Sequence, residues 1–361
     1  MRLRNKILLP QGKLCYDTRD YLRRCLRVMK EFNEITMIKL RRLLYITTML
    51  TAVLFLCTGC SNEREEKQLQ LREQGITYLE NEQYKEAIEA FQCALDESLG
   101  EIDEVELDIC YYKAEAQYLS GDVEGAVGTY TTIINYNNDP RAYYLRGNLN
   151  YTMNEEYALK DYASAAEYDK HTDYELYIGI YEAMKAHGNN EGTAYLEEAL
   201  KIKGDTAYDK MQKGRIKFLL GSYGDAVTLL EEAAAGKEYE AYFYLAEVYL
   251  SNLAISSVNA MEEAKNNMNA YIASGVADSY KLYNIAENQL NKGYYDISIS
   301  CLEAALKLKE VPNKQIVMKT LAIAYEKTSN FVVARDVLTD YVKLYPEDEE
   351  AKRELTFLET R

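Results

Sequence analysis

Residues 71–95, LREQGITYLENEQYKEAIEAFQCAL, contain a pattern that recurs along most of the chain. The small residue Gly75 is followed twelve positions later by Ala87, and Phe91 and Ala94 come four and seven positions after Ala87. Residues spaced by four and seven lie on one face of an α-helix. The stretch therefore predicts two helices that cross closely at Gly75 and Ala87, with Phe91 filling the space beside them.

The same pattern starts at eight places, with a mean spacing of about 35 residues. Turn sequences such as SGD at 120–122 and LGSY at 220–223 fall between the two helices of a copy, and three of the four prolines lie between copies, where a helix must end. Such a period predicts a repeat architecture in which each helix pair buries its apolar face against the next. The eight opening residues are Gly75, Ala114, Gly147, Gly179, Gly214, Ala246, Ala286 and Ala322, and the three prolines are Pro140, Pro312 and Pro346.

This repeat resembles the tetratricopeptide repeat (TPR) of about 34 residues, which has a small residue in its first helix and an Ala-x3-Phe pattern in its second. The resemblance covers residues 68–348; the third copy is one residue short, and the sixth has six extra residues within 251–263. It implies an all-α fold, a TPR-type α-solenoid that forms a right-handed superhelix of about eight helix-turn-helix repeats. Residues 349–361 are expected to form the C-terminal capping helix that solenoids need.

Charge and motif content exclude several function classes. Residues 61–361 carry 30 Lys and Arg against 54 Asp and Glu, a net charge of −24, which would repel a nucleic-acid backbone. Residues 61–361 have no Gly-rich phosphate loop, HExxH or CxxC motif, and the segment GDTAYDKMQKG at 204–214 does not have the sequence context of such a motif. His171 and His187 are its only histidines. We therefore expect no enzyme activity, no metal site and no cofactor.

Three cysteines lie within the repeats, at Cys93, Cys110 and Cys301. Their places in the repeat favour buried free thiols that pack as small apolar side chains. A disulfide between Cys93 and Cys110 is possible, but nothing in the sequence indicates it.

The segment LLYITTMLTAVLFLCTGCSNEREE, residues 43–66, changes from apolar to highly charged. Basic residues at 39, 41 and 42 precede a 15-residue apolar run, the length of a secretory signal. Thr58-Gly59-Cys60 resembles the lipobox of bacterial lipoproteins, although Cys57 stands where that family usually has Leu. The resemblance implies lipidation of Cys60. The alternative is an uncleaved signal anchor, and in either case the body of the chain lies outside the cytoplasm.

Three segments are predicted in the N-terminal region. Residues 37–60 are the lipoprotein signal peptide or signal anchor, and residues 61–67 are a charged linker. Residues 1–36 precede the start expected at Met37, so they are either a mis-annotated extension or a short cytoplasmic tail. The predicted location is the extracytoplasmic side of a bacterial cell membrane, with attachment through an N-terminal lipid.

The TPR resemblance also implies a groove, lined by the first helix of each repeat, that binds peptides or protein segments. Tyrosine suits such a surface because it offers a large contact area and a polar tip, although any single ring can instead pack against the next repeat. A Lys/Asn clamp for a terminal carboxylate is not evident, because Ile76 lies one turn after Arg72. The candidate groove residues are Tyr111, Tyr118, Tyr144, Asn148, Tyr151, Arg215, Phe218, Phe243 and Tyr283.

These observations predict a membrane-anchored scaffold for protein–protein interaction, which would assist the assembly of an envelope, secretion or cell-surface complex. The acidic body favours a partner with basic or aromatic segments. The alternative is a surface lipoprotein that binds a glycan or another solute in its Tyr-rich groove.

Overall fold

The structure is a computed structural model that describes residues 63–98, 100, 102–251 and 259–360. All regular secondary structure in these residues is helical. The expected signal segment and its lipidation residue Cys60 lie outside the described residues, and so do residues 252–258, part of the stretch 251–263 that holds the six extra residues of the sixth copy.

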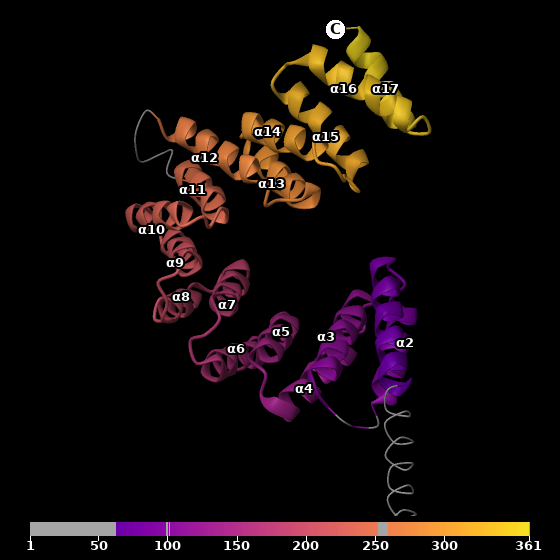
Figure 1. Ribbon diagram of the computed structural model, residues 1–361, viewed down its shortest axis with the longest axis vertical. Helices are drawn as coiled ribbons and strands as arrows, with labels where there is room; N and C mark the ends of the chain where they lie inside the picture. Colours follow the sequence, from indigo (N-terminus) through magenta and orange to yellow (C-terminus); the bar gives the residue numbers. More distant parts are fainter. Residues whose placement is uncertain (1–62, 99, 101, 252–258, 361) are drawn as a thin grey trace, which may run out of the picture. The chain divides into compact units, whose positions relative to one another are not determined.

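The described chain divides into two compact units, one up to residue 133 and the other from residue 134. In the first unit, residues 63–80 are helical and are followed by α2 (Tyr84–Glu97), α3 (Glu104–Leu119) and most of α4 (Val123–Asn137). Figure 1 shows these helices in indigo and purple. Residues 61–67 were predicted to be a linker, but the chain is helical from residue 63. Glu, Arg, Lys and Gln dominate this stretch, and all of them favour the helix.

The second unit contains the remaining helices, from magenta to yellow in Figure 1. They are α5 (Pro140–Asn150), α6 (Glu155–Asp169), α7 (Tyr174–Ala186), the 3-10 turn η1 (Asn190–Gly192), α8 (Thr193–Ala199), α9 (Ala207–Leu219), α10 (Tyr223–Ala235), α11 (Glu240–Ser251), α12 (Ala260–Ser274), α13 (Ser279–Lys292), α14 (Tyr295–Leu306), α15 (Lys314–Lys327), α16 (Phe331–Leu344) and α17 (Glu349–Glu359).

Consecutive helices of the second unit pack as pairs, in the order that the repeat predicts. Each of α5, α7, α9, α11, α13 and α15 is the first helix of a pair and contacts the helix after it, and α17 packs on α16. Figure 1 shows the two helices of each pair side by side. The all-α fold of stacked helix pairs predicted from the sequence is therefore confirmed.

Small residues permit the close crossings inside the pairs, as the pattern predicts. A Cβ atom added to Gly75 would lie 2.5 Å from the ring of Phe91, and one added to Gly147 would lie 2.7 Å from the ring of Tyr162. At Gly214 the same atom would lie 2.7 Å from Leu230. Real carbon atoms do not approach this closely, so the opening glycine of these copies is required by packing.

Turns and helix starts follow local side-chain chemistry. Gly121, Gly221 and Gly293 have positive φ angles of 87°, 76° and 85° at the turns between paired helices, a conformation that glycine adopts without steric cost. The Asp139 carboxylate accepts a hydrogen bond of 2.9 Å from the Arg141 amide, and Pro140 occupies the first turn of α5. This arrangement is a preferred way to begin a helix.

The cysteines follow the prediction only in part. All three are free thiols, so the structure contains no Cys93–Cys110 disulfide. Cys301 is fully buried in the core, but Cys110 is half-buried and Cys93 is exposed. The expectation of a buried thiol is wrong for Cys93, because the inward side of α2 is occupied by Ala87, Ala90, Phe91 and Ala94.

Candidate functional site

In each of the last four repeats, two positions of the first helix lie on the same side of that helix. They are the sixth residue before the opening small residue and the first residue after it, which are seven residues and about two helical turns apart. We call the residues at these positions in α9, α11, α13 and α15 the first-helix face. It consists of Tyr208, Arg215, Glu240, Glu247, Tyr280, Glu287, Ile316 and Ile323.

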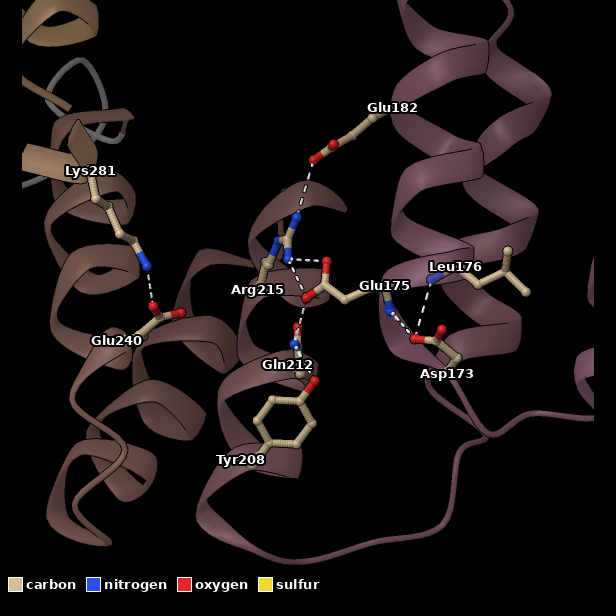
Figure 2. Close-up of polar contacts among 9 residues, drawn as sticks. All are labelled: Asp173, Glu175, Leu176, Glu182, Tyr208, Gln212, Arg215, Glu240 and Lys281. Carbon is tan, nitrogen blue, oxygen red and sulfur yellow. Dashed lines mark hydrogen bonds and ion pairs between the residues drawn. The ribbon is translucent and has the colours of Figure 1, made fainter. Parts of the chain in front are cut away.

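Ion pairs link this face to neighbouring first helices, as Figure 2 shows around Arg215. Nη1 of Arg215, on α9, lies 2.8 Å and 2.9 Å from the two carboxylate oxygens of Glu175, on α7. Nη2 of Arg215 lies 3.4 Å from Glu182, which is about two helical turns after Glu175 on α7. Gln212 donates a further hydrogen bond of 2.7 Å to Glu175. The guanidinium is therefore held between two carboxylates of the preceding pair.

Arg215 also lies over the ring of Tyr244 on α11, 5.4 Å from its centroid. Burial raises the pKa of the Tyr244 hydroxyl to about 12, and nearby Arg215 only partly opposes that effect. The hydroxyl therefore stays neutral at physiological pH, and the ring offers its π face to the cation. Arg215 thus contacts both neighbouring first helices, and it is a structural link rather than a free cation.

The same kind of link joins α11 to α13. Glu240 pairs with Lys281, as Figure 2 also shows. Glu247 lies 3.1 Å from Lys292 and accepts a hydrogen bond from Gln289. Both glutamates of the first-helix face on α11 are therefore charge-compensated by α13.

The first unit contains a corresponding link. Nε of Arg72, in the helix of residues 63–80, donates a hydrogen bond of 2.6 Å to Asp108 on α3, and Gln68 donates one of 2.5 Å to Glu106. Arg72, where the sequence shows no Lys/Asn clamp for a terminal carboxylate, instead joins two consecutive first helices.

The last two first helices expose apolar side chains instead. Tyr280 on α13 is 52% exposed, and Ile316 and Ile323 on α15 are 47% and 45% exposed. The two helices contact each other. Glu287, one residue after the opening small residue of α13, accepts a 3.0 Å hydrogen bond from Tyr283, and within the described chain no lysine or arginine lies at ion-pair distance from it. These residues form the candidate site, an apolar surface with one uncompensated carboxylate.

Three of the predicted groove residues, from α5 and its end, contact other side chains of the protein. The Tyr144 ring lies 6.2 Å from that of Tyr162, and Asn148 accepts a 2.7 Å hydrogen bond from the Tyr162 hydroxyl. Tyr151 follows the end of α5, is only 6% exposed, and stacks on His187 with centroids 4.0 Å apart. These side chains stabilise the contact between helices, and Tyr151 presents little surface to a ligand.

Most of the other predicted aromatic residues contact an aromatic ring of the second helix in their own pair. Phe218 lies 6.1 Å from Tyr223, and Phe243 lies 5.8 Å from Tyr271. In the first unit, Tyr111 lies 6.1 Å from Tyr130, whereas Tyr118 is 53% exposed at the end of α3. Tyr283 adjoins the candidate site through its hydrogen bond to Glu287, and burial followed by that bond raises the pKa of its hydroxyl.

Sequence reasoning missed the residues that link the first helices, although the sequence does contain a signal for them. Linked partners are separated by 36 to 45 residues, as in Arg72–Asp108, Glu175–Arg215, Glu240–Lys281 and Glu247–Lys292. This separation is one repeat plus up to about two or three helical turns. A search for opposite charges at that offset would have found them. The exposed residues Ile316 and Ile323 would have been found at the two positions that define the first-helix face.

No cluster of His, Cys, Asp and Glu suited to a metal ion occurs among residues 63–98, 100, 102–251 and 259–360. Within those same residues, none of the helices combines the length and the hydropathy needed to span a bilayer.

Comparison with known proteins finds one family match and several similar solved structures. Residues 72–140 match the family model described as tetratricopeptide repeat. Similar solved structures include a tetratricopeptide repeat protein from Parabacteroides merdae, with 12% identity, 72% of this chain and 99% of that chain covered, and a TM-score of 0.41. A TPR repeat-containing protein from Cytophaga hutchinsonii has 16% identity, coverages of 78% and 98%, and a TM-score of 0.37.

The yeast Sti1 TPR2AB domain, solved in a complex with pHSP90, has 17% identity, coverages of 73% and 99%, and a TM-score of 0.29. No curated protein sequence matches the chain. The family match over residues 72–140 and the helix pairs that the repeat predicts support a tetratricopeptide repeat protein.

Proposed function

We propose that this TPR protein holds a segment of a partner protein on the surface formed by α13 and α15. The TPR fold is a scaffold for protein–protein interaction, and the finer assignment rests on one observation. Two contacting first helices expose Tyr280, Ile316 and Ile323, next to a carboxylate, Glu287, that lacks a cation. The partner segment would place apolar side chains on the tyrosine and isoleucines and a basic side chain on Glu287.

The ion pairs on α9 and α11 favour α13 and α15 over the rest of the first-helix face as the binding surface. Arg215, Glu240 and Glu247 already have partners within the chain, so binding at those residues would break existing ion pairs. At α13 and α15, binding removes apolar surface from water at about 25 cal/mol per Å2 without breaking such pairs.

An affinity-capture experiment tests the proposal. Tagged full-length chain is recovered from its own cells, and co-purifying proteins are compared with those of a variant carrying Tyr280→Ser, Ile316→Ser and Ile323→Ser. The matched control carries Tyr157→Ser and Val332→Ser on the second helices α6 and α16, where those side chains are 60% and 59% exposed. We expect the first variant alone to lose a specific partner by about tenfold or more.

Two results would contradict the proposal: equal partner recovery by both variants, or a wild-type chain that captures no specific protein but binds defined glycans on an array. The second result would support the solute-binding alternative.

We further propose that the chain is attached through a lipid on Cys60 to the outer side of the cell membrane, where it assists assembly of an envelope, secretion or cell-surface complex. The support is the basic, apolar and small-small-Cys order of residues 39–60. Intact mass spectrometry of the membrane-extracted protein should give a chain that begins at a lipid-modified Cys60. A chain that retains the apolar run would instead indicate a signal anchor.

A further inference from the structure

A recess of about 580 Å3 lies at the loops that precede two neighbouring first helices, α7 and α9. Its wall includes Tyr174 from α7 and Tyr208 from α9, whose rings meet edge to face with centroids 6.3 Å apart. Ile202, only 6% exposed, adds an aliphatic surface. This volume falls within the range of small-molecule sites, about 300–1,000 Å3.

Each loop contributes one exposed lysine without an ion-pair partner to the recess. Lys170 precedes α7, and Lys203 precedes α9, 33 positions later in the sequence. Among the described residues, neither ammonium group has a carboxylate within ion-pair distance. A third lysine of the recess, Lys201, is already paired with Glu198 at 2.5 Å. Two uncompensated cations on one recess stand out in a chain whose net charge is −16.

The loop that carries Lys170 is fixed in an unusual conformation. Lys170 and His171 have φ angles of 56° and 63°, a left-handed conformation that costs energy in residues other than glycine. The Asp169 carboxylate holds the loop, because it accepts hydrogen bonds of 2.8 Å and 2.7 Å from the amide and hydroxyl of Thr172. His171 is fixed by a 2.8 Å contact between its Nε2 and Glu198. Lys170 is thus presented by an ordered loop.

The two carboxylates that line the recess are engaged with the protein. Asp173 accepts a 2.9 Å hydrogen bond from the Glu175 amide and caps α7. Asp209 accepts hydrogen bonds from the amide and hydroxyl of Thr206 and from the Tyr174 hydroxyl. Both groups stabilise the starts of their helices. The lysine side chains, in contrast, remain available to a ligand.

We propose that this recess binds a small organic anion whose acid group contacts Lys170 and Lys203 while its apolar body lies against Ile202, Tyr174 and Tyr208. Charge-assisted hydrogen bonds from the lysines would provide the directional contacts. The rings and the aliphatic side chain would remove an apolar body of the ligand from water. This inference is independent of partner binding at α13 and α15, since the recess involves neither helix.

Ligand-observed NMR titrations with four probes test the proposal on the full-length chain in detergent micelles, with empty micelles as the blank. The probes are phenyl phosphate, benzoate, inorganic phosphate and benzyl alcohol. We expect at least one aromatic anion to bind at least about tenfold more tightly than inorganic phosphate and benzyl alcohol. Whichever of phenyl phosphate and benzoate binds more tightly shows whether the recess prefers a phosphate or a carboxylate.

Variants assign the binding to the recess. The double variant Lys170→Gln, Lys203→Gln should bind the tighter of the two aromatic anions about tenfold or more weakly, because both charged contacts are lost. The matched control pair, Lys307→Gln and Lys309→Gln, removes two exposed lysines from the loop after α14 and should leave binding unchanged. The proposal is overturned by equal effects of the two pairs, or by Kd values above about 10 mM for both aromatic anions.

Discussion

The Arg215 guanidinium of α9 lies 2.8 Å from the Glu175 carboxylate of α7, a contact that joins residues 40 positions apart in the sequence. It links the first helices of two consecutive pairs, and Arg215 also stacks over Tyr244 of the following pair. One side chain thus connects three consecutive repeats. Apolar contacts hold the two helices of a pair together, and charged contacts such as this one link the first helices of neighbouring pairs.

Removing this link should destabilise the protein. The Arg215 side chain is only 16% exposed, so Arg215→Met leaves Glu175 and Glu182 without their cation. We expect the free energy of unfolding to fall by about 1–2 kcal/mol, between the values typical of exposed and buried pairs. Urea denaturation followed by circular dichroism measures it. Arg353→Met is the control, because that arginine is exposed on α17; equal losses in both variants would argue against a link at Arg215.

The crossing glycines should tolerate no side chain. In Gly147→Ala the new Cβ would lie 2.7 Å from the fully buried ring of Tyr162, so the helices must separate or the ring must move. We expect a loss of about 1–3 kcal/mol in the free energy of unfolding. Gly128→Ala, in the middle of α4 with open space around it, should instead stabilise the chain by up to about 1 kcal/mol. If Gly147→Ala and Gly128→Ala change the thermal unfolding temperature equally, the close helix crossing does not explain the glycine at position 147.

The packing of the last helix, α17, on α16 should weaken at acid pH. A hydrogen bond from the Ala351 amide, followed by one from the Tyr341 hydroxyl and by Lys319, lowers the pKa of Asp348 to about 2. Because this value lies below the ordinary carboxyl pKa of about 4, ionisation of Asp348 favours the folded state. Its contribution is complete above about pH 4 and is lost as the pH falls through about 2.

The pH dependence is measured by comparing Asp348→Asn with the wild type at several pH values. The difference in urea midpoint between the two proteins should be largest near neutral pH and should vanish toward pH 2. A difference that stays constant down to pH 2 would show that Asp348 acts without its charge.

The cysteines should react in a fixed order. Cys93 is exposed and should be alkylated first, while burial raises the pKa of Cys110 and that of Cys301, the latter to about 12. Because the thiolate is the reactive species, Cys301 should resist iodoacetamide until the chain unfolds. Mass spectrometry of timed alkylation, with and without denaturant, gives the order. Early modification of Cys301 in the native protein would contradict its placement in the core.

The sequence predicted the fold well because repeat packing depends on few residue types. Gly75, Gly147 and Gly214 recur at one place in the pattern, and each lies against the large side chain that the pattern predicts. The period alone therefore predicts the paired helices of the described chain.

The surface was harder to predict, since a tyrosine at a first-helix position can face a ligand or a neighbouring helix. Tyr151 fits the aromatic row in the sequence but stacks on His187, from the end of the next first helix. In the sequence Arg215 is typical of a ligand-binding cation, but its partners lie on the neighbouring first helices, about one repeat away in either direction. Only the three-dimensional packing distinguishes these roles, because the same repeat position is filled by a paired charge in α11 and by isoleucine in α15.

The most direct test of the central claim is site-specific photo-crosslinking in the cells that make the protein. A photoreactive phenylalanine analogue is placed at position 280, 316 or 323, and, as controls, at the exposed positions 157 and 332. If α13 and α15 bind a partner segment, the first three positions should crosslink to the same protein while the two control positions do not. Crosslinks to that protein from the control positions, or none from 280, 316 and 323, would contradict it.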